Sequence, residues 1–257
     1  MKHIKPICAV LATISFVLSL TACSGQDVII AGIDQNQVPL SFNDSSGNLS
    51  GFEIDLATEA AKRAGLTVTF KHINWNNKAK EIQAGNVNSL WGKLTLNDTE
   101  KSDMLFTNEY FLNKQIILVL KDSIIKSSGD LQNKSLGALT GSQAASSLKD
   151  SDITAKLNGG QITFFDDYDT QFLALDSGQI DAVAMDQTMA NYYINEHTIK
   201  YKVLPNVLSQ EKFVIGFRRN DSKLRNLIQN SLDSMAADGS TERLSTKWFN
   251  ENLTVSK

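Results

Sequence analysis

The sequence predicts an α/β protein in which helices cover the faces of the sheets. Strand and helix patterns alternate between residues 28 and 91, and a second alternating series begins near residue 136. Glycines follow several of the expected helices, where a left-handed residue commonly ends a helix. Alternating strands and helices of this kind are typical of α/β sheets with covered faces.

In the first series, the apolar run at 28–33 has the pattern of a buried strand. Apolar residues from Phe52 to Ala64 then recur at helical spacing, and Gly65 follows where a C-cap glycine belongs. A polar turn cluster at 43–48 separates these two elements. The other elements expected here are a strand at 68–72, a helix at 77–84 that ends at Gly85, and a short strand at 89–91.

A long apolar strand is expected at 110–120, before the second series starts. The chain is 42% hydrophobic and 21% charged, a balance typical of globular proteins, and it contains no low-complexity segment. The later elements are strands at 136–139, 162–165, 180–185 and 213–217, a helix after Gly141, and helices at 170–176, 224–237 and 241–249.

The first 22 residues have the layout of a secretory signal peptide. Lys2 and Lys5 precede a mostly apolar run at 7–20, which is too short to span a bilayer as a helix. The sequence Leu-Thr-Ala-Cys that ends at Cys23 resembles the lipobox of bacterial lipoproteins, in which cleavage before the cysteine frees its thiol to carry lipid. The alternative is an ordinary signal peptide with an incidental cysteine. The lipobox implies that residues 1–22 are removed and that Cys23 anchors the protein to the outer face of the bacterial cell membrane.

The cysteine and histidine counts exclude several kinds of chemistry. Cys8 lies in the segment to be removed and Cys23 carries lipid, so the folded part has no thiol for a disulfide, a nucleophile or a metal. Only His72 and His197 remain after Cys23, too few for a multi-histidine metal site. We therefore expect no metal and no cofactor. The net charge of −3, which falls further when two signal lysines are lost, argues against a nucleic-acid partner.

A weak internal repeat relates one segment of each series. Residues 85–93 align without gaps with residues 178–186, and in both copies a glycine precedes a strand that ends in a charged residue. That residue is Lys93 in the first copy and Asp186 in the second. Because open α/β sheets bind ligands outside the carboxyl ends of their strands, the repeat places one cation and one anion at equivalent rims. Two ordinary βα units would produce the same match, and that interpretation stays open.

Short motifs in a characteristic order cover most of the chain after residue 27. They are 51–57, the segment of Trp75, 94–96, 106–110, 130–131, 134–137, 140–142, 178–182 and the ending 238–249. In this order and spacing the chain resembles the bacterial extracellular solute-binding proteins of family 3, the polar amino-acid receptors of ABC importers.

The resemblance implies a two-lobed, type II periplasmic-binding-protein-like fold with two hinge crossover strands. Lobe 1 would comprise residues 27–112 plus 207–257, and lobe 2 residues 113–206. The long strand near residue 115 and the segment around Pro205 fit the two crossovers. Such lobes close by a hinge motion in which ligand contacts favour the closed state.

The resemblance also implies which residues hold a ligand. Asp186 matches the aspartate that holds the α-ammonium group of an amino acid, and Thr95 and the carbonyl of Gly92 match further ammonium contacts. Ser142 and Gln143 start a helix, where free N–H groups and the helix dipole favour a carboxylate. Asp186 and Ser142 would equally serve as helix N-caps.

Three more residues would line the walls of the pocket. Trp75 matches the position that packs against the ligand, although an aromatic residue there can also belong to the core. Gln37 stands where many members have an aromatic residue, which favours a one-sided or more polar pocket. Asp34 ends the first strand and would either touch the ligand or cap a turn.

The largest departure from the family concerns an arginine. Members usually carry one shortly after the segment of Thr95, where it grips the ligand carboxylate through two hydrogen bonds. Here the matching position is Glu100. We expect Lys93 to supply the missing positive charge, with Lys101 as the other candidate. The alternative is that Lys93 points to solvent and that the ligand is not a standard α-amino acid.

These features predict a substrate-binding lipoprotein of an ABC importer. It would be a monomer that captures a small polar solute, in the first place an amino acid, and delivers it to a membrane permease. No nucleophile–base pair or phosphate-binding loop is evident, so we expect no enzyme activity. Two alternatives use the same fold: an extracytoplasmic dehydratase of prephenate or arogenate, and a ligand-sensing receptor that signals through a membrane partner.

Overall fold

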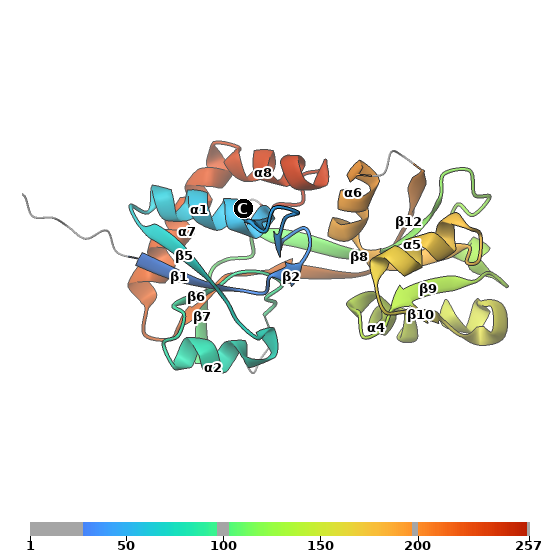
Figure 1. Ribbon diagram of the computed structural model, residues 1–257, viewed down its shortest axis with the longest axis horizontal. Coiled ribbons are helices and arrows are strands. Elements are labelled where there is room, and N and C mark those ends of the chain that lie inside the picture. The colour runs from blue at the N-terminus through green and yellow to red at the C-terminus, as the bar shows by residue number, and fades with distance from the viewer. Residues whose placement is uncertain (1–27, 97–102, 197–199, 256–257) are drawn as a thin grey trace, which may run out of the picture.

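The computed structural model describes residues 28–96, 103–196 and 200–255 (Figure 1). They form two lobes that lie side by side along the long axis of the molecule. Strands β8 (Phe111–Leu120) and β12 (Tyr201–Phe213) run between the lobes. Each lobe contains a five-stranded sheet, so the predicted two-lobed α/β fold is confirmed.

The sheet of lobe 1 has the strand order β5-β1-β6-β13-β7. Strand β1 is parallel to β5 and β6, whereas β13 is antiparallel to β6 and β7. The strands are β1 (Val28–Ile33), β5 (Thr67–His72), β6 (Ser89–Leu90), β7 (Met104–Phe106) and β13 (Gly216–Arg218). The helices are α1 (Phe52–Arg63), α2 (Lys78–Gln83), α7 (Ser222–Ala237) and α8 (Ser240–Phe249), with a short 3₁₀ turn η1 (Trp75–Asn77) before α2.

Helix α1 shows how local sequence builds this lobe. Gly51 precedes it with φ of +134°, a conformation that L side chains rarely adopt, and a Cβ there would lie 2.2 Å from the carbonyl oxygen of Leu40. Phe52, Leu56 and Ala60 lie on one face and are fully buried. That face packs in the main apolar cluster of lobe 1, together with residues of β1, α7 and α8. Burial of this stripe anchors the helix on the sheet.

The sheet of lobe 2 has the strand order β10-β9-β11-β8-β12. The strands β9 (Leu136–Leu139), β10 (Thr163–Phe165) and β11 (Ala182–Asp186) are parallel, and β8 is antiparallel to β11 and β12. Helix α4 (Gln143–Lys149) belongs to the apolar cluster on one face of the sheet, whereas α5 (Tyr168–Asp176) and α6 (Gln187–Glu196) belong to the cluster on the other. The short helices η2 (Ser128–Leu131), η3 (Thr154–Lys156) and η4 (Asn158–Gly160) connect these elements.

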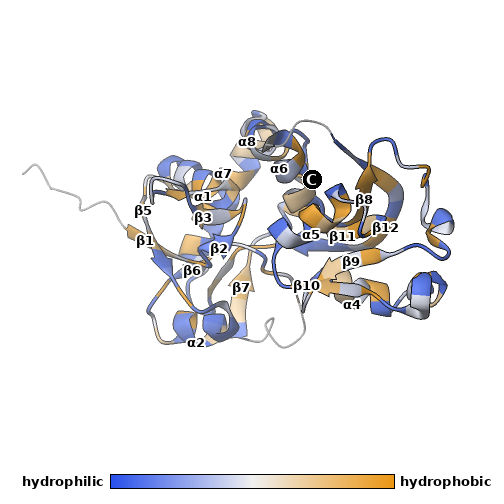
Figure 2. Ribbon diagram, turned by 45° about the vertical axis from the view of Figure 1, so that its right-hand side comes forward, coloured by the Kyte–Doolittle hydropathy of each residue, from blue (hydrophilic) through white to orange (hydrophobic). Residues whose placement is uncertain are grey.

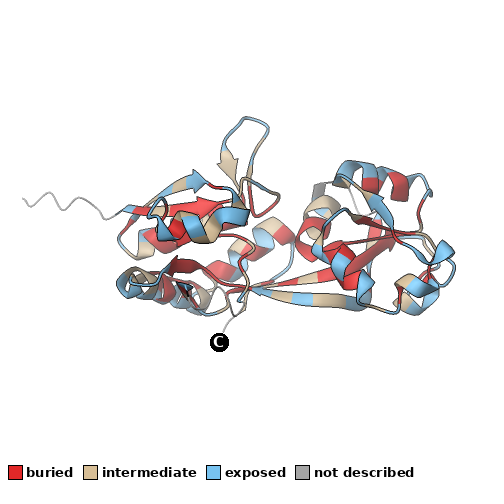
Figure 3. Cartoon of the chain, turned by 90° about the horizontal axis from the view of Figure 1, so that it is seen from below, coloured by how far each residue is buried: buried red, intermediate tan, exposed pale blue. Residues whose placement is uncertain are grey.

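A small antiparallel sheet β2-β3-β4 completes lobe 1. Its strands are β2 (Asn36–Gln37), β3 (Ser41–Asn43) and β4 (Leu49–Ser50). Hydrophobic colour concentrates on the strands of the two large sheets, such as β7 and β9, while α2 is largely hydrophilic (Figure 2). The strands of both lobes are accordingly rich in buried residues, and the helices alternate between buried and exposed positions (Figure 3).

Several segments differ from the sequence prediction. The single strand expected at 213–217 is divided, because Phe213 ends β12 and Gly216 starts β13 in the other sheet. Between them the amide of Val214 bonds the carbonyl of Leu94 at 2.9 Å. Apolar periodicity reports burial and not sheet membership, so it could not show this division. Helix α6 and the full length of β12 were not expected as regular elements, since polar residues interrupt both apolar patterns.

Candidate functional site

Asp186 is the centre of a polar cluster between the lobes. It ends β11, directly opposite Gln115 of β8, and it is 7% exposed. Its Oδ1 accepts hydrogen bonds from Asn113 Nδ2 at 2.7 Å and from Gln115 Nε2 at 2.8 Å. Asn113 and Gln115 are two positions apart on one strand, so both side chains leave the same face and converge on this carboxylate.

Lys93 reaches the same carboxylate from the other lobe. It follows β6 of the lobe 1 sheet, and its Nζ lies 3.0 Å from Oδ2 of Asp186. The side chain of Lys93 is 29% exposed and that of Asp186 is 10% exposed, so the ion pair is partly shielded from water. The internal repeat placed these two charges at equivalent strand ends, and the structure brings them into direct contact.

The Asp186 carboxylate is stabilised in its ionised form. Burial alone would raise its pKa, but the charge of Lys93 and the hydrogen bonds from Gln115, Lys93 and Asn113 outweigh burial. The pKa of Asp186 therefore lies below its ordinary value. A buried carboxylate that stays charged at neutral pH is suited to hold a cationic group.

Two further members of the cluster escaped the sequence analysis. Glu211 of β12 lies opposite Asn113, whose Nδ2 is 3.3 Å from its Oε2. Burial, the largest cause, and the charge of Asp186 raise the pKa of Glu211 despite the hydrogen bond from Asn113. Burial, the largest cause, and the charge of Asp186 raise the pKa of the Tyr168 phenol on α5.

A sequence signal for part of this cluster did exist. Asn113 and Gln115 alternate in the otherwise apolar strand β8, and both are fully buried. Their carbonyl oxygens, Oδ1 and Oε1, are buried and have no hydrogen-bond partner among the described residues. Polar residues at the buried positions of a strand need partners, which marks such positions as candidates for a site.

A second group lies on lobe 1, around the glycine that precedes Lys93. Gly92 has φ of +135°, and a Cβ on it would lie 3.3 Å from Oε1 of Gln37 and 3.5 Å from Cη2 of Trp75. Oε1 of Gln37 is buried without a partner, while its Nε2 donates to Asp34 at 3.3 Å. Asp34 also accepts from the amide of Asn36, as in a capped turn. The structure thus brings together Gly92, Gln37, Trp75 and Asp34.

Two other predicted ligand-binding residues on lobe 1, Gly92 and Thr95, already form backbone contacts within the protein. The carbonyl of Gly92 accepts a hydrogen bond of 2.7 Å from the amide of Leu94. Thr95 forms an isolated bridge with Phe213, at the lobe 1 end of β12, and is half-buried. Thr95 therefore lies next to the crossover strand, and one acceptor site of the Gly92 carbonyl is already used.

Ser142 acts as the N-cap of α4. Its Oγ accepts from the amide of Ala145 at 3.1 Å and donates to the carbonyl of Leu139 at 2.9 Å. Gln143 is exposed at the first position of the helix. The capping role of Ser142 is thus observed, while its hydrogen bonds stay within this turn and do not reach Lys93 or Asp186.

The lobes also touch through helix α6. Glu251, just after α8, accepts hydrogen bonds from Gln187 Nε2 at 2.7 Å and from Asn191 Nδ2 at 3.0 Å. The rings of Phe42 and Tyr192 meet edge to face with centroids 6.2 Å apart. A second interlobe contact therefore lies on the helix that starts directly after Asp186.

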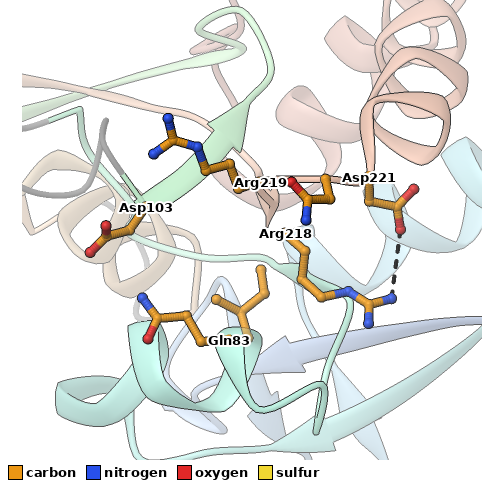
Figure 4. A pocket seen from close by; sticks show the side chains of 7 residues that line it. Gln83, Asp103, Arg218, Arg219 and Asp221 are labelled. Carbon is orange, nitrogen blue, oxygen red and sulfur yellow. Dashed lines mark ion pairs between the residues drawn. The ribbon is translucent and has the colours of Figure 1, made fainter.

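A cavity of about 390 Å³ in lobe 1 contains none of these residues. It is lined by Arg218, Arg219, Asp103 and Asp221, with neutral residues between them. Arg218 pairs with Asp221 at 3.7 Å, and the two guanidinium groups point in different directions (Figure 4). Because its charges do not converge, we take the interlobe cluster as the candidate site.

Some predicted features lie outside the described residues, namely Cys23, Glu100 and Lys101. Within the described ranges, no helix combines the length and the apolar character needed to cross a membrane. The same part of the chain holds no group of three or more histidine, cysteine, aspartate or glutamate side chains arranged to bind a metal ion.

Comparison with known proteins agrees with this fold. The probable amino-acid-binding protein YxeM of Bacillus subtilis is 26% identical over 97% of this chain and 95% of its own length. The L-cystine-binding protein TcyJ of Escherichia coli is 24% identical over 88% and 84%, respectively. A polar amino acid ABC uptake transporter substrate-binding protein from Streptococcus thermophilus superposes with a TM-score of 0.80, at 28% identity over 89% of this chain and 88% of that one.

The family pattern described as bacterial extracellular solute-binding proteins, family 3, matches residues 29–251. This match spans both lobes and both crossover strands. The family and these relatives are described as solute-binding proteins and not as enzymes, which favours the binding function over the dehydratase alternative. The chain belongs to family 3 of the bacterial extracellular solute-binding proteins.

Proposed function

We propose that this protein is the substrate-binding component of an ABC importer and that it captures a polar amino acid between its two lobes. The observation that carries the proposal is the meeting of Lys93 and Asp186 across the lobes at 3.0 Å. A free amino acid has one ammonium and one carboxylate group, so its site needs both signs of charge. The names of YxeM and TcyJ, which are described as binding amino acids or cystine, support this ligand class.

In this proposal lobe 1 is 27–112 plus 207–257, lobe 2 is 113–206, and the ligand closes one lobe on the other. Asp186 holds the ammonium group, supported by Thr95 and the second acceptor site of the Gly92 carbonyl. The start of α4, with Ser142 and Gln143, faces the ligand carboxylate. Trp75 packs against the ligand, and Gln37 and Asp34 line the wall beside Gly92.

Three buried side-chain carbonyl oxygens that lack a hydrogen-bond donor support a polar ligand. Gln37 on lobe 1 and Asn113 and Gln115 on the crossover strand each bury a carbonyl oxygen without a protein partner. A buried acceptor without a donor costs about 1–3 kcal/mol, so a ligand with N–H groups would gain by reaching these atoms. This pattern favours an amino acid with further N–H donors over an acidic one.

A ligand screen tests the proposal. Thermal unfolding of the protein is followed with each of the twenty amino acids and with cystine. A ligand at 100 times its dissociation constant should stabilise the protein by about 2.7 kcal/mol. A reproducible rise in the unfolding temperature with one or a few amino acids is expected. No shift with any of them would contradict the proposed ligand class.

We further propose that Cys23 carries lipid and tethers a monomer beside its membrane permease. Four residues separate Cys23 from β1, a spacer of about 14 Å at full extension. The test compares wild type and Cys23→Ser in detergent phase partition after expression in a bacterial host. Wild type should enter the detergent phase and the variant the aqueous phase. An equal distribution of the two proteins would contradict the anchor.

A further inference from the structure

We propose that the ion pair between Lys93 and Asp186 is the ligand-free form of a zwitterion site. An amino acid binds by inserting between the two residues. Its ammonium group replaces the Lys93 ammonium on Asp186, and Lys93 moves to the ligand carboxylate. This inference rests on the proposed amino-acid function and assigns to Lys93 the place of the missing arginine.

Among the residues that the structure describes, Asp186 has one hydrogen-bonding partner from the opposite lobe. Asn113 and Gln115 lie on β8, the neighbour of β11, and the sheet register fixes both amides on Oδ1. Tyr168 belongs to the same lobe. Lys93 approaches from lobe 1, and it takes the other oxygen, Oδ2. A hinge movement therefore separates Lys93 from Asp186 and leaves the remaining hydrogen bonds intact.

Lys93 is also the partner best able to move. Its side chain is 29% exposed, whereas Asn113 and Gln115 are fully buried. A lysine ammonium is a compact charge on a flexible stem, so it can turn from one carboxylate to another. It needs no fixed fork geometry, unlike the arginine of other family members.

Charge balance explains why a zwitterion fits this insertion. Before binding, the cation of Lys93 neutralises the anion of Asp186. After insertion, each residue faces the opposite charge of the ligand, so no partly buried charge is left unpaired. A simple amine would occupy Asp186 but leave Lys93 without its partner. Glu211, which lies in the same cluster, is the competing anion to which a released Lys93 could turn.

Matched ligand pairs and one variant test the insertion. Affinities are measured by calorimetry for arginine, histidine, cystine and glutamine, each beside its decarboxylated amine: agmatine, histamine, cystamine and 4-aminobutanamide. Wild type should prefer the best-bound amino acid over its amine by at least about 10-fold, the effect of a hydrogen bond to a charged group. Lys93→Met should weaken binding of the amino acid and strengthen binding of the amine.

The diagnostic result is that Lys93→Met changes the affinities for the amino acid and for its amine in opposite directions. If Lys93 were only a competitor for Asp186, or turned to Glu211 on release, Lys93→Met would strengthen binding of both ligands. If Lys93 only supported the structure, the variant would weaken both. Either of these results overturns the insertion. Failure of the wild type to bind any of the twenty amino acids or cystine contradicts the proposed function itself, whereas equal affinity for an amino acid and its amine contradicts the insertion alone.

Two controls separate charge from folding. Lys93→Arg keeps the positive charge and should retain the preference for the amino acid. Lys212→Met removes another paired lysine, which bonds Glu109 at 2.7 Å from β12 outside the cluster, and should leave the preference unchanged. Thermal unfolding of all variants without ligand establishes that each is folded. A preference lost equally in Lys212→Met would also overturn the role of Lys93.

Discussion

Tyr110 and Glu53 form a buried hydrogen bond of 2.6 Å between the phenol hydroxyl and Oε1 of the carboxyl group. Glu53 lies in the first turn of α1 and is fully buried, and its Oε2 has no hydrogen-bond partner. Burial raises the pKa of Glu53 from 4.5 to about 7, although the hydrogen bond from Tyr110 opposes the shift. The core of lobe 1 thus contains a carboxyl group that titrates near neutral pH.

Glu53→Gln should therefore stabilise the protein above neutral pH. The unfolded chain loses the Glu53 proton near pH 4.5 and the folded chain near 7, so the stability of the wild type falls as pH rises through this interval. The full penalty, about 3 kcal/mol for a shift of this size, remains above pH 7. Thermal unfolding should show similar midpoints at pH 4.5 and a variant with a midpoint higher by roughly 6–12 °C at pH 8.

The exposed Glu242 offers a matched control in α8. Glu242→Gln should follow the pH dependence of the wild type. If Glu53→Gln and the wild type differ by the same amount at both pH values, the titration of Glu53 does not govern the stability of lobe 1.

Asp186→Asn should abolish amino-acid binding. The change removes the negative charge and places an amide beside the donors of Asn113, Gln115 and Lys93. The new amide N–H group would face other hydrogen-bond donors, so buried donors would lose their acceptor. The ligand ammonium group would also find no negative charge at this position. Calorimetry should show a loss of affinity of about 100-fold or more. Retention of affinity within threefold would show that the ammonium binds elsewhere.

Gly92→Ala should cost stability as well as affinity. The backbone at Gly92 has φ of +135°, and a Cβ would press on Gln37 and Trp75. Strain of this kind costs of the order of 1–3 kcal/mol. Gly47→Ala is the matched control, since Gly47 also has positive φ but open space around its Cβ position. Denaturant unfolding should show the larger loss for Gly92→Ala; equal losses would mean that the contacts at Gly92 do not matter.

Trp75 should report ligand binding by fluorescence. The chain has three tryptophans, at positions 75, 91 and 248. Trp91 is fully buried and bonds Ser89, and the indole of Trp248 bonds Asp55 of α1 and packs on Phe42. Trp75 is half-buried beside Gly92 and is the one adjacent to the candidate site. Trp75→Phe should therefore remove most of the ligand-induced emission change, which Trp248→Phe should retain.

Sequence periodicity predicted most strands and helices because burial and local geometry repeat along them. Strand β9 and helix α8 lie within one residue of their expected bounds. Helix α6 and the edge strand β12 were missed because polar residues on their exposed positions break the apolar pattern. The site was predicted in part, since Asp186 ends β11 and Lys93 lies just beyond β6, whereas Glu211 and Tyr168 carry no local signal.

The sequence by itself determined the α/β class, the membership of family 3 and the charged residues at two strand ends, because these properties reside in local pattern and motif order. Only the tertiary structure decided that Lys93 lies on Asp186 at 3.0 Å and that Asn113 and Gln115 hold the other oxygen. These contacts join residues that are 71 to 93 positions apart in the chain. They depend on sheet register and on how the two lobes meet, which no local pattern encodes.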